Sequence, residues 1–221
     1  MIGHAVFDLD GTLVDSVPLF VEILNAMLAD RGSPLWLSEA EVRPHATAGG
    51  LAMVKSLLGE ACGEPPAAIA EFRERYAAIP TPASSLYSGV REGLTALRHS
   101  GVILALFSNK TQGLCDKVVR ELELSHLFSA VVGTSPGVPL KPDPAGLDLA
   151  LARAGGVRQR SCYVGDSGAD HALALAAGVP LIMVSWGYGE PGMDWPGATI
   201  AHEFASVPSL VVAALSAKVA A

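Results

Sequence analysis

The chain has 221 residues, of which 50% are hydrophobic and 17% charged, and its formal net charge is -7. This composition predicts a folded globular protein that is large enough for one core with an accessory lobe, or for two modest domains. The negative charge and the lack of a basic stripe argue against a nucleic-acid-binding protein. An anionic substrate would need a local cation to attract it.

The three cysteines, Cys62, Cys115 and Cys162, are widely spaced and form no CxxC pattern. Such a set is typical of reduced thiols in a cytoplasmic protein and argues against a structural zinc site. The N-terminus has no basic segment followed by an apolar one, as a secretory signal would. The longest apolar run, residues 172–184, is too short to cross a bilayer. We therefore expect a cytoplasmic protein with no membrane partner.

Short apolar runs alternate with helical segments along most of the chain. Continuous apolar strands between helices are typical of a parallel sheet that is covered on both faces. We therefore predict an α/β fold with a doubly wound, Rossmann-like parallel sheet. The expected strands are residues 5–9, 103–107, 130–132, 162–164 and 181–184, and the expected helices beside them are residues 90–100, 143–154, 169–177 and 207–220.

A long segment without a convincing strand lies between the first two expected strands. Apolar residues recur in it at helical spacing, and a capping box from Ser38 to Glu41 indicates a helix start. Four helices are expected, beginning near residues 16, 38, 51 and 65. We expect this helical lobe, residues 16–82, to form a domain separate from the core, residues 1–15 and 83–221.

Two carboxylates, Asp8 and Asp10, directly follow the first apolar run, at the sheet edge where open α/β proteins bind ligands. Gly11 permits a sharp turn that could bring them to opposite sides of a bound group. In-line displacement at phosphorus needs a nucleophile on one side and an acid at the leaving group on the other. The alternative is that the two aspartates only cap a turn.

Polar residues follow two further strands of the expected sheet. Ser108 and Asn109 could hydrogen-bond phosphoryl oxygens, although such residues more often cap a helix. Lys141 lies in a proline-stiffened loop before a helix and could neutralise both a phosphoryl group and a carboxylate. Most single lysines are instead solvated at the surface.

Asp166 and Asp170 follow the fourth expected strand, at the mouth of a helix. Together with Asp8 they make an oxygen-rich site that suits a hard, octahedral cation such as Mg²⁺. Helix capping by Asp166 or Ser167 is the alternative, and it is compatible with metal binding.

Four segments, in order and context, resemble the four motifs of the haloacid dehalogenase superfamily. The resemblance covers nearly the whole chain, and each segment stands at the end of an expected strand. The segments are Asp8-Leu9-Asp10-Gly11-Thr12, Ser108-Asn109, Lys141-Pro142, and Gly165-Asp166-Ser167 followed by Asp170.

Within that superfamily the chain looks most like the phosphoglycolate phosphatase branch, because of Asp15-Ser16, the helical insert after the first motif, and the sequence Trp-Gly-Tyr-Gly at residues 186–189. It departs from the branch pattern at Ser88, where proline is usual, and at Gly168-Ala169, where Arg-Asn is commoner. Neither departure is at a catalytic position.

The resemblance implies a role for each matching residue. Asp8 attacks phosphorus to form an aspartyl-phosphate, and Asp10 protonates the leaving oxygen and then activates water. Lys141 and Ser108, with Asn109 beside it, bind the phosphoryl group. The resemblance also implies that Mg²⁺ is bound by Asp8, by Asp166 and by the backbone carbonyl of Asp10. Asp170 would position Lys141 or metal-bound water. Ser167 and Thr12 would support these residues.

The helical insert resembles a C1-type cap, which closes over the active site and recognises the leaving group. Gly49 and Gly50 could let the backbone approach a substrate, with His45, Thr47 and Lys55 as further possible contacts. A Gly-Gly pair more often simply begins a helix. The expected partner is a small phosphorylated metabolite, and the chain is expected to be a monomer or a homodimer.

Other functions of the same or a similar fold are less compatible with these residues. A haloalkanoate dehalogenase needs no acid at the position of Asp10, and a phosphonate-cleaving relative would lack this aspartate. A response-regulator receiver is about half as long, and a catalytically dead binding protein would have lost a motif residue. A phosphomutase resembling β-phosphoglucomutase keeps all four motifs and remains an open alternative.

Overall fold

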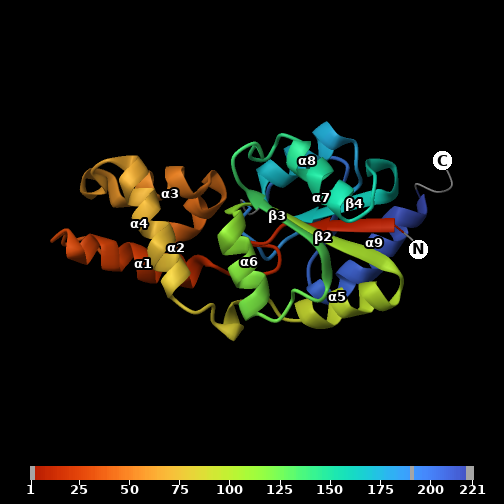
Figure 1. Ribbon diagram of the computed structural model, residues 1–221, viewed down its shortest axis with the longest axis horizontal. Coiled ribbons are helices and arrows are strands. Elements are labelled where there is room, and N and C mark those ends of the chain that lie inside the picture. The colour runs from red at the N-terminus through yellow and green to blue at the C-terminus, as the bar shows by residue number, and fades with distance from the viewer. Residues whose placement is uncertain (1–2, 190–191, 218–221) are drawn as a thin grey trace. The chain divides into compact units, whose positions relative to one another are not determined.

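The computed structural model describes residues 3–189 and 192–217, and the chain divides into two compact units. One unit comprises residues 1–15 and 82–221, and the other is the inserted segment Ser16–Thr81. The first unit holds a six-stranded sheet, and the second is helical (Figure 1).

All strand pairs of the sheet are parallel, in the order β3-β2-β1-β4-β5-β6. This order reverses at β1, so the crevice between the ends of β1 and β4 is the topological switch point where such folds bind ligands. The expected doubly wound α/β fold is therefore confirmed. The strands are β1 Gly3–Phe7, β2 Val102–Thr111, β3 Phe128–Thr134, β4 Ser161–Gly165, β5 Leu181–Val184 and β6 Ala198–Ala201.

Helices cover both faces of the sheet, with α7 and α8 on one side and α5 and α9 on the other (Figure 1). Val6 and Phe107 pack with the α7 and α8 side chains Leu147 and Leu173 in one core cluster. Phe7, the next residue after Val6, points to the opposite face, where its ring stacks 6.3 Å from that of Phe204. The helices of this unit are α5 Val90–His99, α6 Gln112–Glu121, α7 Ala145–Arg153, α8 Gly168–Ala177 and α9 Val207–Ala217.

The inserted unit, Ser16–Thr81, contains α1 and α4, whose aromatic side chains pack together. That it acts as a cap stays a prediction. The rings of Phe20, Phe72 and Tyr76 lie within 5.7 to 6.5 Å of one another in its core. Arg31 at the end of α1 donates two hydrogen bonds to Glu71 of α4. Its helices are α1 Val17–Asp30, α2 Glu39–Val42, α3 Gly50–Leu58 and α4 Pro65–Ala78, with 3-10 turns at Arg43–Ala48 and Gly59–Cys62.

Several expected boundaries are wrong. The first strand ends at Phe7 rather than at residue 9, because Leu9 is buried in the turn that follows and not in the strand. The second continues past residue 107 to Thr111. Helix α6 and strand β6 were not expected, and the last residues of the expected C-terminal helix, 218–220, lie outside the described residues. None of the described helices combines the length and apolar character needed to span a bilayer.

Candidate active site

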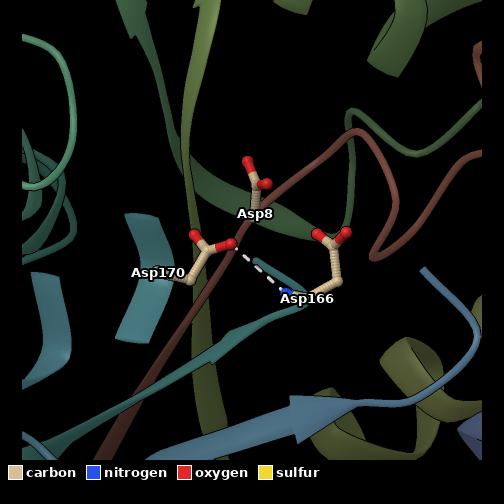
Figure 2. Close-up of side chains that lie close together, drawn as sticks. All are labelled: Asp8, Asp166 and Asp170. Carbon is tan, nitrogen blue, oxygen red and sulfur yellow. Dashed lines mark hydrogen bonds between the residues drawn. The ribbon is translucent and has the colours of Figure 1, made fainter. Parts of the chain in front are cut away.

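The register of the sheet brings the chemistry-bearing residues together. Phe7 of β1 pairs with Leu106 of β2 on one side and with Val164 of β4 on the other. β1 and β4 end at this level, at Phe7 and Gly165, while β2 runs on to Thr111. Asp8, Asp166 and Ser108 of β2 therefore lie along one edge of the sheet. Figure 2 shows Asp8, at the end of β1, converging with the Asp166 and Asp170 side chains.

Lys141 is buried between two carboxylates. Its Nζ lies 2.8 Å from Asp8 Oδ1 in an ion pair and donates to Asp170 Oδ1 at 2.7 Å. Burial by itself would lower the pKa of Lys141, but the two carboxylates outweigh it and raise this pKa above its usual value. The lysine is therefore a permanent cation beside Asp8. Asn109 holds this loop, since its Oδ1 accepts a hydrogen bond from the Lys141 backbone N–H at 2.8 Å.

Asp170 joins the lysine to the loop after β4. Its Oδ2 accepts hydrogen bonds from the backbone N–H groups of Asp166 and Ser167 and from the Ser167 hydroxyl, which makes a capping box at the start of α8. Burial favours the neutral acid, but Lys141 and the Ser167 hydrogen bonds prevail and lower the pKa of Asp170. Asp170 is thus a carboxylate that pairs with Lys141, and of the two expected caps, Asp166 and Ser167, it is Ser167 that caps α8.

Asp8 has a different electrostatic balance. Burial is the largest influence and raises its pKa from 3.8 to about 6, against the attraction of Lys141 and with help from the Asp170 charge. Lys141 pairs with two carboxylates, Asp8 and Asp170. Asp170 is also part of the helix cap of α8, whereas Asp8 is not. A buried, incompletely neutralised carboxylate at a sheet edge is suited to nucleophilic attack.

The Asp166 carboxylate is held by two segments of the chain, residues 11–12 and 187–188. Its Oδ1 accepts a hydrogen bond from the Thr12 hydroxyl at 3.0 Å, and its Oδ2 accepts one from the Tyr188 backbone N–H at 2.7 Å. Gly11 has a φ of +83°, and any side chain there would collide with the Asp166 carboxylate. Gly187 is confined in the same way. Glycine is therefore required at both positions for the loops to close around Asp166.

The carboxylates of Asp8, Asp166 and Asp170 suit a divalent cation. They offer oxygen atoms that all lie within 4.8 Å of one another. Burial, and next the charges of Asp170 and Asp8, raise the pKa of Asp166 well above its usual value, so the crowded acids lack positive charge. With Asp10 counted and all four acids ionised, the ammonium groups of Lys141 and Lys110 would leave two negative charges uncompensated. Hard oxygen ligands with that excess match the preference of Mg²⁺.

Asp10 and Ser108 lie at the same edge of the sheet. Asp10 follows β1 by three residues and is paired with Lys110, whose Nζ donates to both of its carboxylate oxygens, at 2.8 and 2.9 Å. Ser108 is buried, and its Oγ accepts a hydrogen bond from the Lys110 backbone N–H at 3.3 Å. The turn after β1, strand β2 and the loop before α7 therefore bring Asp10, Ser108 and Lys141 to the edge of the sheet where Asp8 lies.

The glycines of the inserted unit have a local explanation. Gly49, with a φ of +84°, precedes α3, and Gly50 is its first residue. A side chain at Gly50 would press on Ile69 of α4, at 3.1 Å. The interpretation of this pair as a helix start thus accounts for both residues, and contact of Gly49 or Gly50 with a substrate stays a prediction, as do contacts of His45.

Two residues of the site were missed in the sequence. Lys110 directly follows Ser108 and Asn109, and its contact with Asp10 is not marked by any of the motifs. Tyr163 of β4 is fully buried, with its hydroxyl 3.2 Å from Lys141 Nζ and 3.1 Å from Asp170 Oδ1. Burial, followed by the charge of Asp170, raises the pKa of Tyr163 well above its usual value, so its proton stays in place. The sequence did contain a signal for Tyr163, because it is a polar residue in an apolar strand, two residues before Gly165-Asp166.

Comparison with known families agrees with this geometry. A family model described as haloacid dehalogenase-like hydrolase matches residues 5–184, and the chain belongs to this family.

Its relatives include phosphatases. The phosphoglycolate phosphatase of Caulobacter vibrioides is 35% identical over 217 residues, which cover 95% of this chain and 91% of the relative. The plasmid-encoded phosphoglycolate phosphatase of Cupriavidus necator is 37% identical over 189 residues, covering 84% and 81%. A crystal structure from Haemophilus somnus, described as a predicted phosphoglycolate phosphatase, aligns with a TM-score of 0.82 and 26% identity over 94% of this chain and 97% of that one. The expected enzyme class, a phosphoglycolate phosphatase-like phosphoric monoester hydrolase, is confirmed.

Proposed function

We propose that the protein is a Mg²⁺-dependent phosphatase that hydrolyses a small phosphate monoester through an aspartyl-phosphate on Asp8. The observation that carries the proposal is the placement of the Asp8 carboxylate 2.8 Å from the buried Lys141 ammonium group, beside Asp166. Phosphoryl transfer needs alignment and neutralisation of charge more than it needs covalent chemistry from the protein. This edge of the sheet supports both needs.

In the first half-reaction Asp8 attacks phosphorus while Asp10 gives a proton to the leaving oxygen, so that the alcohol departs neutral. In the second, Asp10 takes a proton from water as that water attacks the aspartyl-phosphate, and the Asp8 carboxylate and inorganic phosphate are released. Lys141 and Ser108 bind the phosphoryl oxygens. The buried ion pair with Asp170 keeps Lys141 oriented for this contact.

Asp8, Asp166 and the backbone carbonyl of Asp10 are the proposed holders of Mg²⁺. When bound, the ion supplies charge neutralisation for the transferring phosphoryl group. Thr12 and the Tyr188 backbone keep the Asp166 carboxylate in place by their hydrogen bonds. The two negative charges that the fully ionised site would carry in excess support a divalent cation.

Phosphoglycolate is the first substrate to test, because the relatives at 35% and 37% identity are phosphoglycolate phosphatases. Sugar phosphates form the second group. The proposed partner is therefore a small phosphorylated metabolite.

The proposal is tested by measuring the release of inorganic phosphate in the presence of Mg²⁺ or of EDTA. The substrates are phosphoglycolate, p-nitrophenyl phosphate, sugar phosphates, nucleoside monophosphates and pyrophosphate. We expect release from at least one small monoester only when Mg²⁺ is present. Glucose 1-phosphate and glucose 6-phosphate belong in the panel. Their interconversion without phosphate release would instead identify a phosphomutase, and inertness toward every ester would contradict the proposal.

A further inference from the structure

Asp10 is held by a lysine that no assigned role uses. Lys110 Nζ donates to both Asp10 oxygens, at 2.8 and 2.9 Å, and the side chain of Lys110 is 5% exposed. A lysine is rarely buried to this degree without a charged partner, because removing its ammonium group from water is costly. The two-pronged contact restrains rotation of the carboxylate as well as neutralising it.

The backbone around Lys110 is fixed by close packing. Its carbonyl oxygen accepts a hydrogen bond from the buried Cys115 thiol at 3.5 Å, and its N–H donates to Ser108 Oγ. A side chain at Gly133 of the neighbouring strand would press on that same carbonyl, at 2.8 Å. The pairing of β2 with β3 also shifts register between Phe107 and Thr111. The strand irregularity and the glycine therefore allow Lys110 to approach Asp10 from a defined direction.

We propose that Lys110 is the positioning residue of Asp10: it orients the carboxyl group for proton transfer and compensates the charge that appears when the proton leaves. This inference rests on the proposed function. In the first half-reaction the O–P bond of the ester breaks, the Asp8–P bond forms, and the Asp10 proton passes to the leaving oxygen. The carboxylate that remains on Asp10 then lies beside an ammonium group already in position, which needs no reorganisation.

This role has a signature that depends on the leaving group. An alkyl alcohol leaves poorly as an anion and needs the Asp10 proton, whereas p-nitrophenolate is stable without it. The ratio kcat/KM includes only the steps up to departure of the leaving group. Loss of Lys110 should therefore lower kcat/KM for an alkyl phosphate and spare kcat/KM for p-nitrophenyl phosphate. Hydrolysis of the aspartyl-phosphate also uses Asp10, so this second step should become slower as well. For the aryl ester, kcat and KM should then fall by the same factor, and their ratio should stay unchanged.

The test measures kcat and KM of the full-length protein with Mg²⁺ on both kinds of ester. The variants are Lys110→Met, Lys110→Gln and Lys110→Arg, with Asp10→Asn as the reference. For Lys110→Met we expect kcat/KM to fall about 10- to 100-fold on the best alkyl phosphate and less than about 3-fold on p-nitrophenyl phosphate. Lys110→Arg should recover most of the loss, because a guanidinium group also binds both carboxylate oxygens.

Lys117→Met is the matched control. Lys117 is a buried lysine in the same unit, and it pairs with Glu121 one helical turn away in α6. Its removal should change both esters alike and by less than about 3-fold. Melting temperatures of all variants separate misfolding from a local effect, and the milder Lys110→Gln replaces Lys110→Met if the latter unfolds.

A second measurement is the double variant Asp10→Asn/Lys110→Met. If Lys110 acts through Asp10, the double variant should be no slower on the alkyl ester than Asp10→Asn alone. Equal loss on both esters in the Lys110 variants, no loss on either, or full additivity in the double variant would overturn the inference. If the wild-type protein hydrolyses neither ester, the proposed function fails instead.

Discussion

Lys141 and Lys110 neutralise carboxylates at the same edge of the sheet, but in different surroundings. The Lys141 side chain is 3% exposed and lies between Asp8, at 9%, and Asp170, at 0%. Lys110 is equally buried, yet its partner Asp10 is 17% exposed. The proposed nucleophile thus lies in a cluster largely shielded from water, while the proposed acid and base is more exposed. A group that takes up and releases protons in each turnover benefits from that exposure.

Removal of the nucleophile gives the largest effect expected. Asp8→Asn should lower kcat by at least about 10⁴-fold, because no other carboxylate is placed to replace it. The free energy of unfolding should change by less than about 1 kcal/mol, since the amide has the same shape and Lys141 keeps Asp170 as a partner.

Phosphate release and urea denaturation of the same preparation measure both effects. Asp148→Asn, at an exposed aspartate paired with Arg158 in the same unit, is the matched control and should keep full activity. Substantial activity in Asp8→Asn would contradict its role.

Stability of the two lysine variants compares the clusters directly. Lys141→Met leaves two buried carboxylates without their cation and should cost about 3 to 5 kcal/mol of unfolding free energy. Lys110→Met should cost less, because Asp10 can be hydrated in part. Urea denaturation at pH 7 checks the order, and an equal or reversed cost would show that the difference in burial has no energetic consequence.

The pH dependence of Mg²⁺ binding tests the crowding of the carboxylates. Because the pKa of Asp8 is raised from 3.8 to about 6, the metal-free folded protein binds this proton more tightly than the unfolded chain. This contribution to stability is present below about pH 4 and is lost as the pH rises to about 6. Mg²⁺ needs the carboxylate, so stabilisation by Mg²⁺ should grow over the same window.

Differential scanning fluorimetry measures this as a shift in melting temperature. At a Mg²⁺ concentration 100 times the Kd, the free energy of unfolding should rise by about 2.7 kcal/mol at pH 7.5 and by less at pH 5. Asp166→Asn should lose the shift. A shift that is the same at both pH values, or that survives in Asp166→Asn, would contradict the proposed ligands.

The smallest effect concerns Tyr163. Its hydroxyl lies 3.1 Å from the Phe107 carbonyl oxygen as well as 3.2 Å from Lys141 Nζ. Tyr163→Phe should cost about 1 kcal/mol, the usual worth of one hydrogen bond. In the double variant with Lys141→Met the two costs should not add, because both residues belong to one buried network. Strict additivity would place Tyr163 outside it.

The sequence predicts the core better than it predicts the ends of its elements. Continuous apolar runs locate five of the six strands. Strand β6 was missed because Thr199 and Ile200 are exposed at the sheet edge, so no buried run marks it. Helix α6 did carry a signal, since its buried positions Leu114, Cys115 and Val118 repeat at helical spacing.

The site follows a similar division. Residues within recognisable motifs, such as Asp8 and Lys141, could be named because their order along the chain carries the information. Lys110 and Tyr163 could not be assigned, because their contacts depend on the register between β1, β2 and β4. That register is set by packing of whole strands and not by local sequence.

The most direct test of the account is to identify the phosphorylated residue. Asp10→Asn lacks the proposed base for the second half-reaction, so with p-nitrophenyl phosphate and Mg²⁺ it should accumulate the phosphoenzyme. Rapid acid quench, proteolysis and mass spectrometry should find one phosphoryl group on Asp8, in an amount that approaches the enzyme concentration, and none in Asp8→Asn. Phosphate release by the wild-type protein with no phosphorylated peptide, or with the label on Ser108, would contradict an aspartyl-phosphate mechanism.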